Sequence, residues 1–413
     1  MTNLNIDQFI QTLPTQAAHR IQSEDEAIRI AQQLAEQFAK EASLRDQKRQ
    51  LPVDELNAFS QSGLWAITVP KQYGGAGVSW RTALEVIKII SSVDPSLGQL
   101  PQNHLVILEH IRLDGTEAQK KFFFELVLNG VRFGNAFSEI GNKHVADFKT
   151  IIKPVADNAN QYGFEVNGKK FFATGALLAH WVPIVTVNTD GLPHLALVPR
   201  ETHGLTVIND WSGFGQRTTA SGTVTIEQVK VPFEHVVPIY QAFAKPTVAG
   251  PVSQIIQAAI DAGIARGAIQ ETIQYVRQYA RPWIDANQEK ATDDHYTIAA
   301  IGDLKIKLRA AEAVLDLAAD QIEVATNQAD EESVAEASVL VAEAKVLTTE
   351  VAILAANKLF ELSGTRSTLA ELNLDRHWRN ARTHTLHDPV RWKYHLVGNY
   401  FLNGVKPPRH PWA

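Results

Sequence analysis

Two histidines near the end of the chain have the spacing that most directly suggests chemistry. His384 and His387 are three positions apart, so on a helix they share one face. An imidazole titrates near neutral pH and can donate or accept a proton there. Two histidines can also begin a metal site, but no third ligand nearby completes one, so we expect no metal. A purely structural role, in the core or at a helix cap, is the main alternative.

A turn of small residues with one cation is a candidate phosphate site. It reads Ser363-Gly364-Thr365-Arg366-Ser367, and the backbone amides of such a turn can bind an anion. A glycine cap at the end of a helix explains Gly364 equally well. The sequence has no Walker motif and no G-x-G-x-x-G after a strand, so neither a P-loop nor a Rossmann site is indicated.

Hydrophobic periodicity predicts the elements that must position these residues. The first third of the chain predicts helices at 23–45, 52–61, 80–92, 103–113 and 116–128. Short β-branched and aromatic runs predict strands at 149–154, 162–166, 171–173, 182–188, 195–198 and 223–231. Long Ala-rich segments predict helices at 253–279, 297–328, 331–363 and 375–403. We therefore expect a helical domain over 1–132, an antiparallel β-domain over 133–245 and a four-helix bundle over 246–413.

Composition narrows the class of protein. The 413 residues are 45% hydrophobic and carry a net charge of -6, with no basic block, so nucleic acid is not an expected partner. No apolar run approaches the roughly 18 residues that span a bilayer, and the first residues lack a signal-peptide pattern, which predicts a cytoplasmic protein without a membrane contact.

Sulfur is nearly absent from the chain. There is no Cys, and Met1 is the one Met, which excludes disulfides and a thiol nucleophile. Compositional drift is one explanation. We favour the other, which is selection for a protein made when sulfur is scarce.

Three separated motifs resemble the acyl-CoA dehydrogenase superfamily, in the order in which that superfamily has them. The first is Gly134-Asn135-Ala136-Phe137-Ser138-Glu139, and the second is Asn167-Gly168-Lys169-Lys170-Phe171-Phe172-Ala173-Thr174-Gly175. The third comprises Gly215-Gln216-Arg217-Thr218, Ser221-Gly222 and Val229-Lys230-Val231-Pro232. The resemblance covers nearly the whole chain and implies the fold and the bound flavin of that superfamily.

A flavin needs a flat apolar wall and polar groups at its edges. By resemblance Phe172 supplies the wall, and the Thr174 and Ser138 hydroxyls supply donors. Without the flanking turn, Phe172 would be read as a β-core residue, and Ser138 as a cap. The matching position for the flavin phosphate is Arg281, whose alternative is a solvated helix end, with the turn of Gly364 and Arg366 as a second phosphate candidate.

The segment 375–389 separates two branches of the superfamily. Arg376-His377-Trp378-Arg379-Asn380-Ala381-Arg382-Thr383-His384 followed by Leu386-His387-Asp388-Pro389 resembles the flavin monooxygenases, which include dibenzothiophene monooxygenase and the SfnB sulfur-acquisition proteins. Many acyl-CoA dehydrogenases have a catalytic Glu at this place. Asp388 is an acid near it, although Asp before Pro is more simply a turn residue. An acyl-CoA dehydrogenase-like oxidoreductase is therefore the alternative, and a flavin-binding protein without turnover is the third.

The monooxygenase resemblance implies roles for the site residues. His387, with His384 on the same face, would hold the proton of a flavin C4a-hydroperoxide, while Thr174 replaces a site serine and Asn135 matches a site asparagine. The implied cofactor is FMNH2, with FAD as the alternative, delivered by a separate NADH-dependent flavin reductase. The implied assembly is a homotetramer.

One stretch departs from the dibenzothiophene enzyme. Where that enzyme has a His and a Tyr in its site, this chain has Gln99 and Asn103, with His104 matching a further His of the motif. The pocket is thus predicted to be smaller and more polar. We expect O2 and a small sulfide, sulfoxide or sulfone as substrates.

Overall fold

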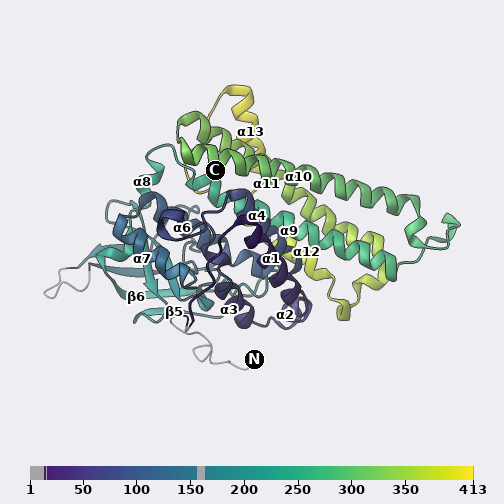
Figure 1. The fold of residues 1–413 in the computed structure, drawn as a ribbon, viewed down its shortest axis with the longest axis horizontal. Helices are drawn as coiled ribbons and strands as arrows, with labels where there is room; N and C mark the ends of the chain where they lie inside the picture. Colours follow the sequence, from purple (N-terminus) through teal and green to yellow (C-terminus); the bar gives the residue numbers. More distant parts are fainter. Residues whose placement is uncertain (1–13, 15, 156–162, 413) are drawn as a thin grey trace.

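The computed structural model describes residue 14, residues 16–155 and residues 163–412. Within them, short helices come first, strands follow and long helices return, as the sequence predicts. The sheet lies at one end of the molecule, and the long C-terminal helices extend away from it (Figure 1). None of the described helices is long and apolar enough to cross a membrane.

The N-terminal helices begin at polar caps. The side chain of Ser23 accepts a hydrogen bond from the backbone N–H of Glu26, and Ser79 accepts one from Thr82. The predicted helix at 23–45 is two helices, because the backbone leaves helical geometry at Glu41. The helices are α1 Glu24–Ala39, α2 Ala42–Lys48, α3 Val53–Gln61, α4 Trp80–Val93, α5 Pro95–Gln99, α6 Pro101–Asp114 and α7 Glu117–Leu128.

In the described part of the chain, seven strands form one sheet in the order β5-β6-β2-β1-β3-β4-β7. The pairings are antiparallel except that β1 runs parallel to β3, with Ile151 opposite Val187, so the expectation of a purely antiparallel sheet is wrong there. The connection through residues 171–180 carries the chain across β1, which makes this pair parallel. The strands are β1 Ile151–Pro154, β2 Phe164–Lys170, β3 Trp181–Val187, β4 Pro193–Pro199, β5 Leu205–Val207, β6 Val224–Val231 and β7 Val236–Val237.

The predicted strand at 171–173 is absent. Phe172 has a φ of 56°, a left-handed conformation that interrupts extended backbone. The segment after β2 therefore turns away from the sheet.

The C-terminal part contains long helices with one break. The predicted helix at 375–403 is two helices, because Pro389 cannot continue a helix and also disfavours helical geometry at Asp388. The expected four-helix bundle therefore has four long segments only if the two helices within 375–403 are counted as one. The helices are α8 Tyr240–Phe243, α9 Ala249–Gln278, α10 His295–Asn327, α11 Glu331–Ser363, α12 Asp375–His384 and α13 Arg391–Asn403.

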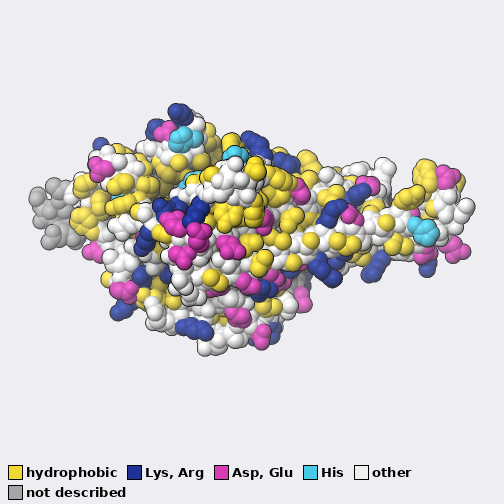
Figure 2. All heavy atoms as spheres, turned by 90° about the horizontal axis from the view of Figure 1, so that it is seen from above, with side chains coloured by type: hydrophobic (Ala, Val, Ile, Leu, Met, Phe, Trp, Pro, Cys, Tyr) yellow, Lys and Arg dark blue, Asp and Glu magenta, His cyan; other side chains and the backbone are white. Residues whose placement is uncertain are grey.

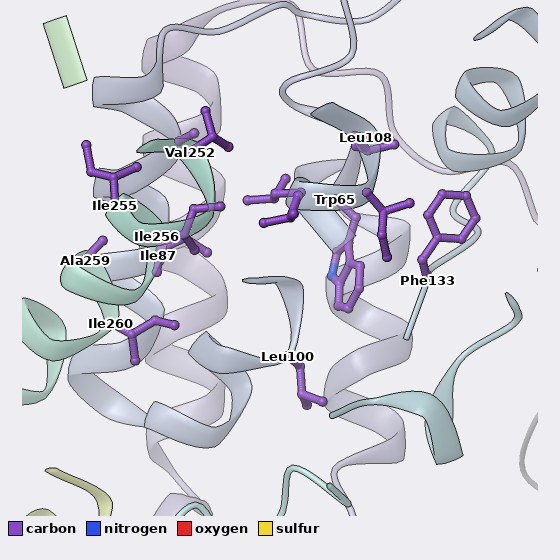
Figure 3. Packing of buried hydrophobic residues seen from close by; sticks show 14 of the residues in the cluster. Trp65, Ile87, Leu100, Leu108, Phe133, Val252, Ile255, Ile256, Ala259 and Ile260 are labelled. Atoms are coloured by element: carbon purple, nitrogen blue, oxygen red, sulfur yellow. The ribbon is translucent and has the colours of Figure 1, made fainter. Parts of the chain in front are cut away.

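The core joins the N-terminal helices to α9. Figure 3 shows Ile87 of α4 among Val252, Ile256 and Ile260 of α9. Gly263 of α9 lets the two helices approach closely, since a Cβ there would lie 2.7 Å from the carbonyl oxygen of Lys88. Ala, Val, Ile, Leu and aromatic side chains fill this core without any thioether.

Candidate active site

A cavity of about 700 Å³ lies between α6, the sheet, the α12–α13 connection and the C-terminal tail. Its wall contains residues from the N-terminal helices, the sheet and its loops, α9, the α12–α13 connection and the C-terminal tail. The fold therefore brings together most of the site residues predicted from the sequence, which are Gln99, Asn103, Asn135, Ser138, Phe172, Thr174, His384 and His387.

His384 forms a buried pair with a carboxylate of α9. Its Nδ1 lies 2.6 Å from Asp261 Oδ1, and the two side chains are 1% and 2% exposed. Thr349 donates to the other oxygen of Asp261 at 3.0 Å. Within the described residues, the buried Nε2 of His384 has no hydrogen-bond partner. Asp261 thus holds the ring through Nδ1, and Nε2 is the ring nitrogen left without a partner.

Three hydroxyls form a chain that begins at Thr174. Thr174 Oγ1 lies 2.7 Å from Ser221 Oγ, and Ser221 Oγ lies 2.7 Å from Thr219 Oγ1. The Thr219 hydroxyl donates its one proton to the carbonyl oxygen of Gln216. Ser221 must therefore donate to Thr219, and Thr174 must donate to Ser221. Thr174 thus presents lone pairs to the cavity, and not the donor that the family resemblance implied.

Asn135 holds the backbone beside this chain. Its Nδ2 donates to the carbonyl oxygen of Thr174 at 3.1 Å, and the side chain is buried. The structure therefore gives Asn135 a positioning contact next to Thr174.

Two aromatic rings stand at the cavity wall. Phe172 is 49% exposed despite its strained backbone, and its ring lies 6.1 Å from that of Trp211, edge to face. Trp211 Nε1 donates to the carbonyl oxygen of Gln216, and Gln216 Nε2 donates to Gln99 Oε1 at 2.9 Å. An exposed aromatic in a left-handed conformation is a surface prepared for a flat ligand. Sequence reasoning missed Trp211 because a lone Trp in a loop carries no pattern.

A loop after Ser138 closes one side of the cavity with Val145, Ala146 and Phe148. The Glu139 carboxylate ties this loop down by accepting from Lys170 Nζ at 2.7 Å and from the backbone N–H of Thr150 at 3.0 Å. Burial raises the pKa of Glu139, but the hydrogen bonds and charge of Lys170, with a further bond from Asn142, outweigh it and lower that pKa to about 2.

Comparison with known proteins identifies the family. Residues 22–130 match the family model "Acyl-CoA dehydrogenase, N-terminal domain", and residues 255–392 match "Acyl-CoA dehydrogenase, C-terminal domain". The chain is 34% identical over 401 residues to dibenzothiophene monooxygenase of Rhodococcus qingshengii, covering 93% of this chain and 95% of that one. It is 31% identical to the probable FMNH2-dependent monooxygenase SfnC of Pseudomonas putida, covering 92% and 96%.

Solved structures agree with the sequence relatives. FMN-bound TdsC from Paenibacillus sp. A11-2 superposes with a TM-score of 0.88 at 34% identity, covering 94% of this chain and all of that one. Methanesulfinate monooxygenase MsuC from Pseudomonas fluorescens gives 0.85 at 30% identity, covering 94% and 99%. The chain belongs to the acyl-CoA dehydrogenase superfamily, in its flavin-dependent monooxygenase branch.

In this member of the superfamily, Asp388, which follows His387, is held in a buried ion pair. Asp388 accepts from Lys345 Nζ at 2.7 Å, and its side chain is 8% exposed. Burial raises the pKa of Asp388, but the charges of Lys345 and His387 outweigh it and hold that pKa well below its ordinary value. His387 Nδ1 lies 3.3 Å from the same oxygen of Asp388. Asp388 thus lies in the bend between α12 and α13, as Asp-Pro predicts, and is also a buried ion-pair partner.

Lys345 itself was not predicted from the sequence. It also donates to Gln254 Oε1 at 2.6 Å and to Gln257 Oε1 at 2.9 Å. The available signal was a pair of amides three residues apart on the first half of α9, which is otherwise mostly apolar as far as Ile260.

Four predicted site residues do not line the cavity. His104 is buried behind it, where the Phe133 N–H donates to Nδ1 and Nε2 donates to the Trp65 carbonyl oxygen. Burial lowers the pKa of His104 to about 3, so it is a neutral core residue, and its assignment to the substrate pocket was wrong. Arg281, Gly364 and Arg366 lie exposed beyond α9 and α11, with the Arg366 guanidinium 5.1 Å from the Tyr279 ring. No group of three or more metal-ligating side chains occurs among the described residues.

Proposed function

We propose that this protein is a monooxygenase that uses reduced FMN and O2 to oxidise a small organosulfur compound. The observation that carries the proposal is the convergence of two aromatic rings, the Thr174 lone pairs and two carboxylate-backed histidines on one cavity. The FMN-bound structural neighbour and the FMNH2-dependent relative support the same cofactor.

The residues at the cavity fit a flavin. Phe172 and Trp211 offer flat apolar surfaces, and Thr174 offers an acceptor suited to an N–H group of the reduced ring. When bound, the flavin supplies the electrons that activate O2. The protein supplies the walls, the proton partners and the exclusion of water.

His384 is the main proton partner in this proposal. Its Nε2 is buried, unpaired within the described chain and backed by Asp261 through Nδ1, so it can take a proton from the reacting group and return it. His387, with a 38% exposed side chain, is placed to exchange that proton with solvent. Asn135 and Thr174 position the ligand between them.

A dehydrogenase reaction on an acyl-CoA is less favoured, because it needs a free carboxylate to remove a proton. Asp388 is the one carboxylate among the described residues that line the cavity, and Lys345 already occupies it. The relatives named as monooxygenases point the same way.

The oxidised compound should be compact and polar. Gln99 and Asn103 line the cavity where we expected polar groups. Gln99 Oε1 already accepts from Gln216, but an apolar polycycle would leave the Gln99 N–H groups and the Asn103 amide without partners, at about 1–3 kcal/mol each. A panel of dimethyl sulfide, its sulfoxide, its sulfone and dibenzothiophene, assayed with a flavin reductase and scored by oxygenated product, tests the proposal. We expect turnover of the compact compounds. Turnover of dibenzothiophene alone would contradict the compact pocket, and turnover of an acyl-CoA without any sulfur compound would contradict the monooxygenase.

The proposed reaction needs a second protein to supply reduced FMN. A separate NADH-dependent reductase would deliver FMNH2, and we propose that both proteins work in the cytoplasm, where NADH is available. The near absence of sulfur from the chain supports expression during sulfur starvation.

We further propose a homotetramer in which a second copy brings its phosphate-binding arginines to this cavity. Arg281 and Arg366 cannot serve the cavity of their own chain because they do not line it. Trp283, Ile284 and Tyr296 near Arg281 are 70%, 81% and 87% exposed. Figure 2 shows a hydrophobic group beside acidic side chains and a histidine at the tip of the long helices, and large exposed apolar side chains of this kind are expected on a surface that contacts another copy.

A further inference from the structure

One face of α6 presents polar side chains to the cavity without partners. Gln102 is 2% exposed, and within the described residues neither Gln102 nor Asn103 has a side-chain hydrogen bond, although both line the cavity. Buried amides are nearly always hydrogen-bonded in folded proteins. Asn103 is half-buried, so the buried amide of Gln102 is the one whose partner must come from the contents of the cavity.

Farther along the same face, His110 is paired with a buried acid. His110 is 5% exposed, and its Nδ1 lies 3.6 Å from Asp114 Oδ2 one helical turn away. Both atoms are buried, and neither has a hydrogen-bond partner within the described residues. The Asp114 side chain is 1% exposed, and a buried carboxylate is costly without a compensating positive charge. A protonated His110 would provide that charge.

In that form His110 has one N–H group besides the one that faces Asp114. Its Nδ1 side faces Asp114, while the ring packs 6.0 Å from the Phe243 ring and lines the cavity beside Tyr240. Nε2–H is therefore available to a ligand. Gln102 and His110 together offer donors on one helix face, with aromatic side chains beside them.

We infer that Gln102 and His110, the latter paired with Asp114, form a hydrogen-bond-donor subsite that binds the sulfur-bound oxygens of a partly oxidised organosulfur substrate. This inference rests on the proposed function and sharpens it. A plain sulfide offers only a weak acceptor and leaves the donors unpaired, whereas sulfone or sulfinate oxygens accept from both. An S-oxygenating reaction must then supply the substrate.

A matched pair of ligands tests the subsite. Sulfolane and tetrahydrothiophene share one ring and differ by the two sulfur-bound oxygens, and methanesulfinate adds an anionic arm. We would titrate each by calorimetry into the full chain loaded with oxidised FMN. The variants Gln102→Leu and His110→Phe each remove one donor. Asp114→Asn removes the carboxylate but keeps the shape of the Asp114 side chain and leaves His110 in place. His295→Phe, on the exposed start of α10, is the control.

We expect the wild type and the control to bind sulfolane at least tenfold more tightly than tetrahydrothiophene. His110→Phe and Gln102→Leu should each weaken sulfolane about tenfold and change tetrahydrothiophene less than twofold. Asp114→Asn should weaken methanesulfinate most, because His110 loses the reason for its charge.

Three outcomes would overturn the subsite. The first is an equal loss of affinity for sulfolane and tetrahydrothiophene, and the second is an unchanged preference for sulfolane in Gln102→Leu and Asp114→Asn. The third is no binding of any oxygenated ligand to the wild type. Turnover assays separate this from the proposed function. Oxygenated product with an unchanged preference removes the subsite alone, whereas the expected preference without any oxygenated product removes the monooxygenase alone.

Discussion

His384 and His387 differ in the way the protein holds them, although the sequence makes them look equivalent. His384 is enclosed with Asp261, whereas His387 is partly open to solvent beside Asp388. Their spacing predicted a shared face, and both line the cavity. The spacing could not reveal Asp261, which is 123 positions earlier in the chain.

The first prediction concerns coupling. His384→Ala and His387→Ala should both keep the fold and FMN binding but release more hydrogen peroxide per NADH oxidised, because the reacting group loses a proton partner. The increase should be larger for His384→Ala. A peroxide assay with the flavin reductase and a true substrate measures the ratio.

Asp261→Asn is the companion variant, since it removes the carboxylate and keeps the side-chain volume. It should show part of the His384→Ala effect. Full coupling in His384→Ala would show that this histidine is structural.

At the scale of elements, the loop fixed by Glu139 gives the sharpest test. Glu139→Gln leaves Lys170 buried without a carboxylate, which should lower the free energy of unfolding by about 3 kcal/mol at pH 7. The pKa of Glu139 is about 2 in the fold against an ordinary value near 4.5, so its contribution is present above pH 4.5 and is lost as the pH falls toward 2. Urea unfolding from pH 7 to pH 3 should show wild type and variant converging at the acid end.

Lys149→Gln in the same loop is the matched control. Its ion pair with Asp147 is largely exposed, so the loss should stay below about 1 kcal/mol. A constant difference between wild type and Glu139→Gln across the pH range would exclude the ionised carboxylate as the cause.

Long periodic elements were predictable because their patterns are local. The helices α3, α4, α7 and α11 end within one or two residues of expectation. The two-residue strand β7 and the three-residue strand β5 are too short for a period, and the parallel pairing of β1 with β3 depends on tertiary placement. Pro389 was visible in the sequence, and the break it causes should have been expected.

At the scale of the whole molecule, Arg281 does not line the cavity of its own chain. If Arg281 of a second copy binds the flavin phosphate, cofactor affinity depends on the assembly. Arg281→Ala should weaken FMN binding through one lost charge-assisted contact of about 1.5–3 kcal/mol, or roughly tenfold to a hundredfold. Fluorescence titration measures the dissociation constant, and light scattering measures the mass of the assembly.

Arg309→Ala, at an exposed position on α10, serves as the control. We expect its FMN affinity and the mass of both variants to match the wild type. An unchanged dissociation constant for Arg281→Ala would move the phosphate site elsewhere, with Arg366 the next residue to replace.

The absence of thioethers from the core should make this enzyme resistant to oxidative damage during turnover. Turnover that misses the substrate releases hydrogen peroxide, which converts Met to a polar sulfoxide and Cys to sulfenic and higher acids. After Met1 this chain offers neither target, so peroxide cannot place a sulfoxide between α4 and α9. Intact-mass spectra after prolonged uncoupled turnover should show at most one added oxygen from sulfur oxidation, with no loss of folded protein.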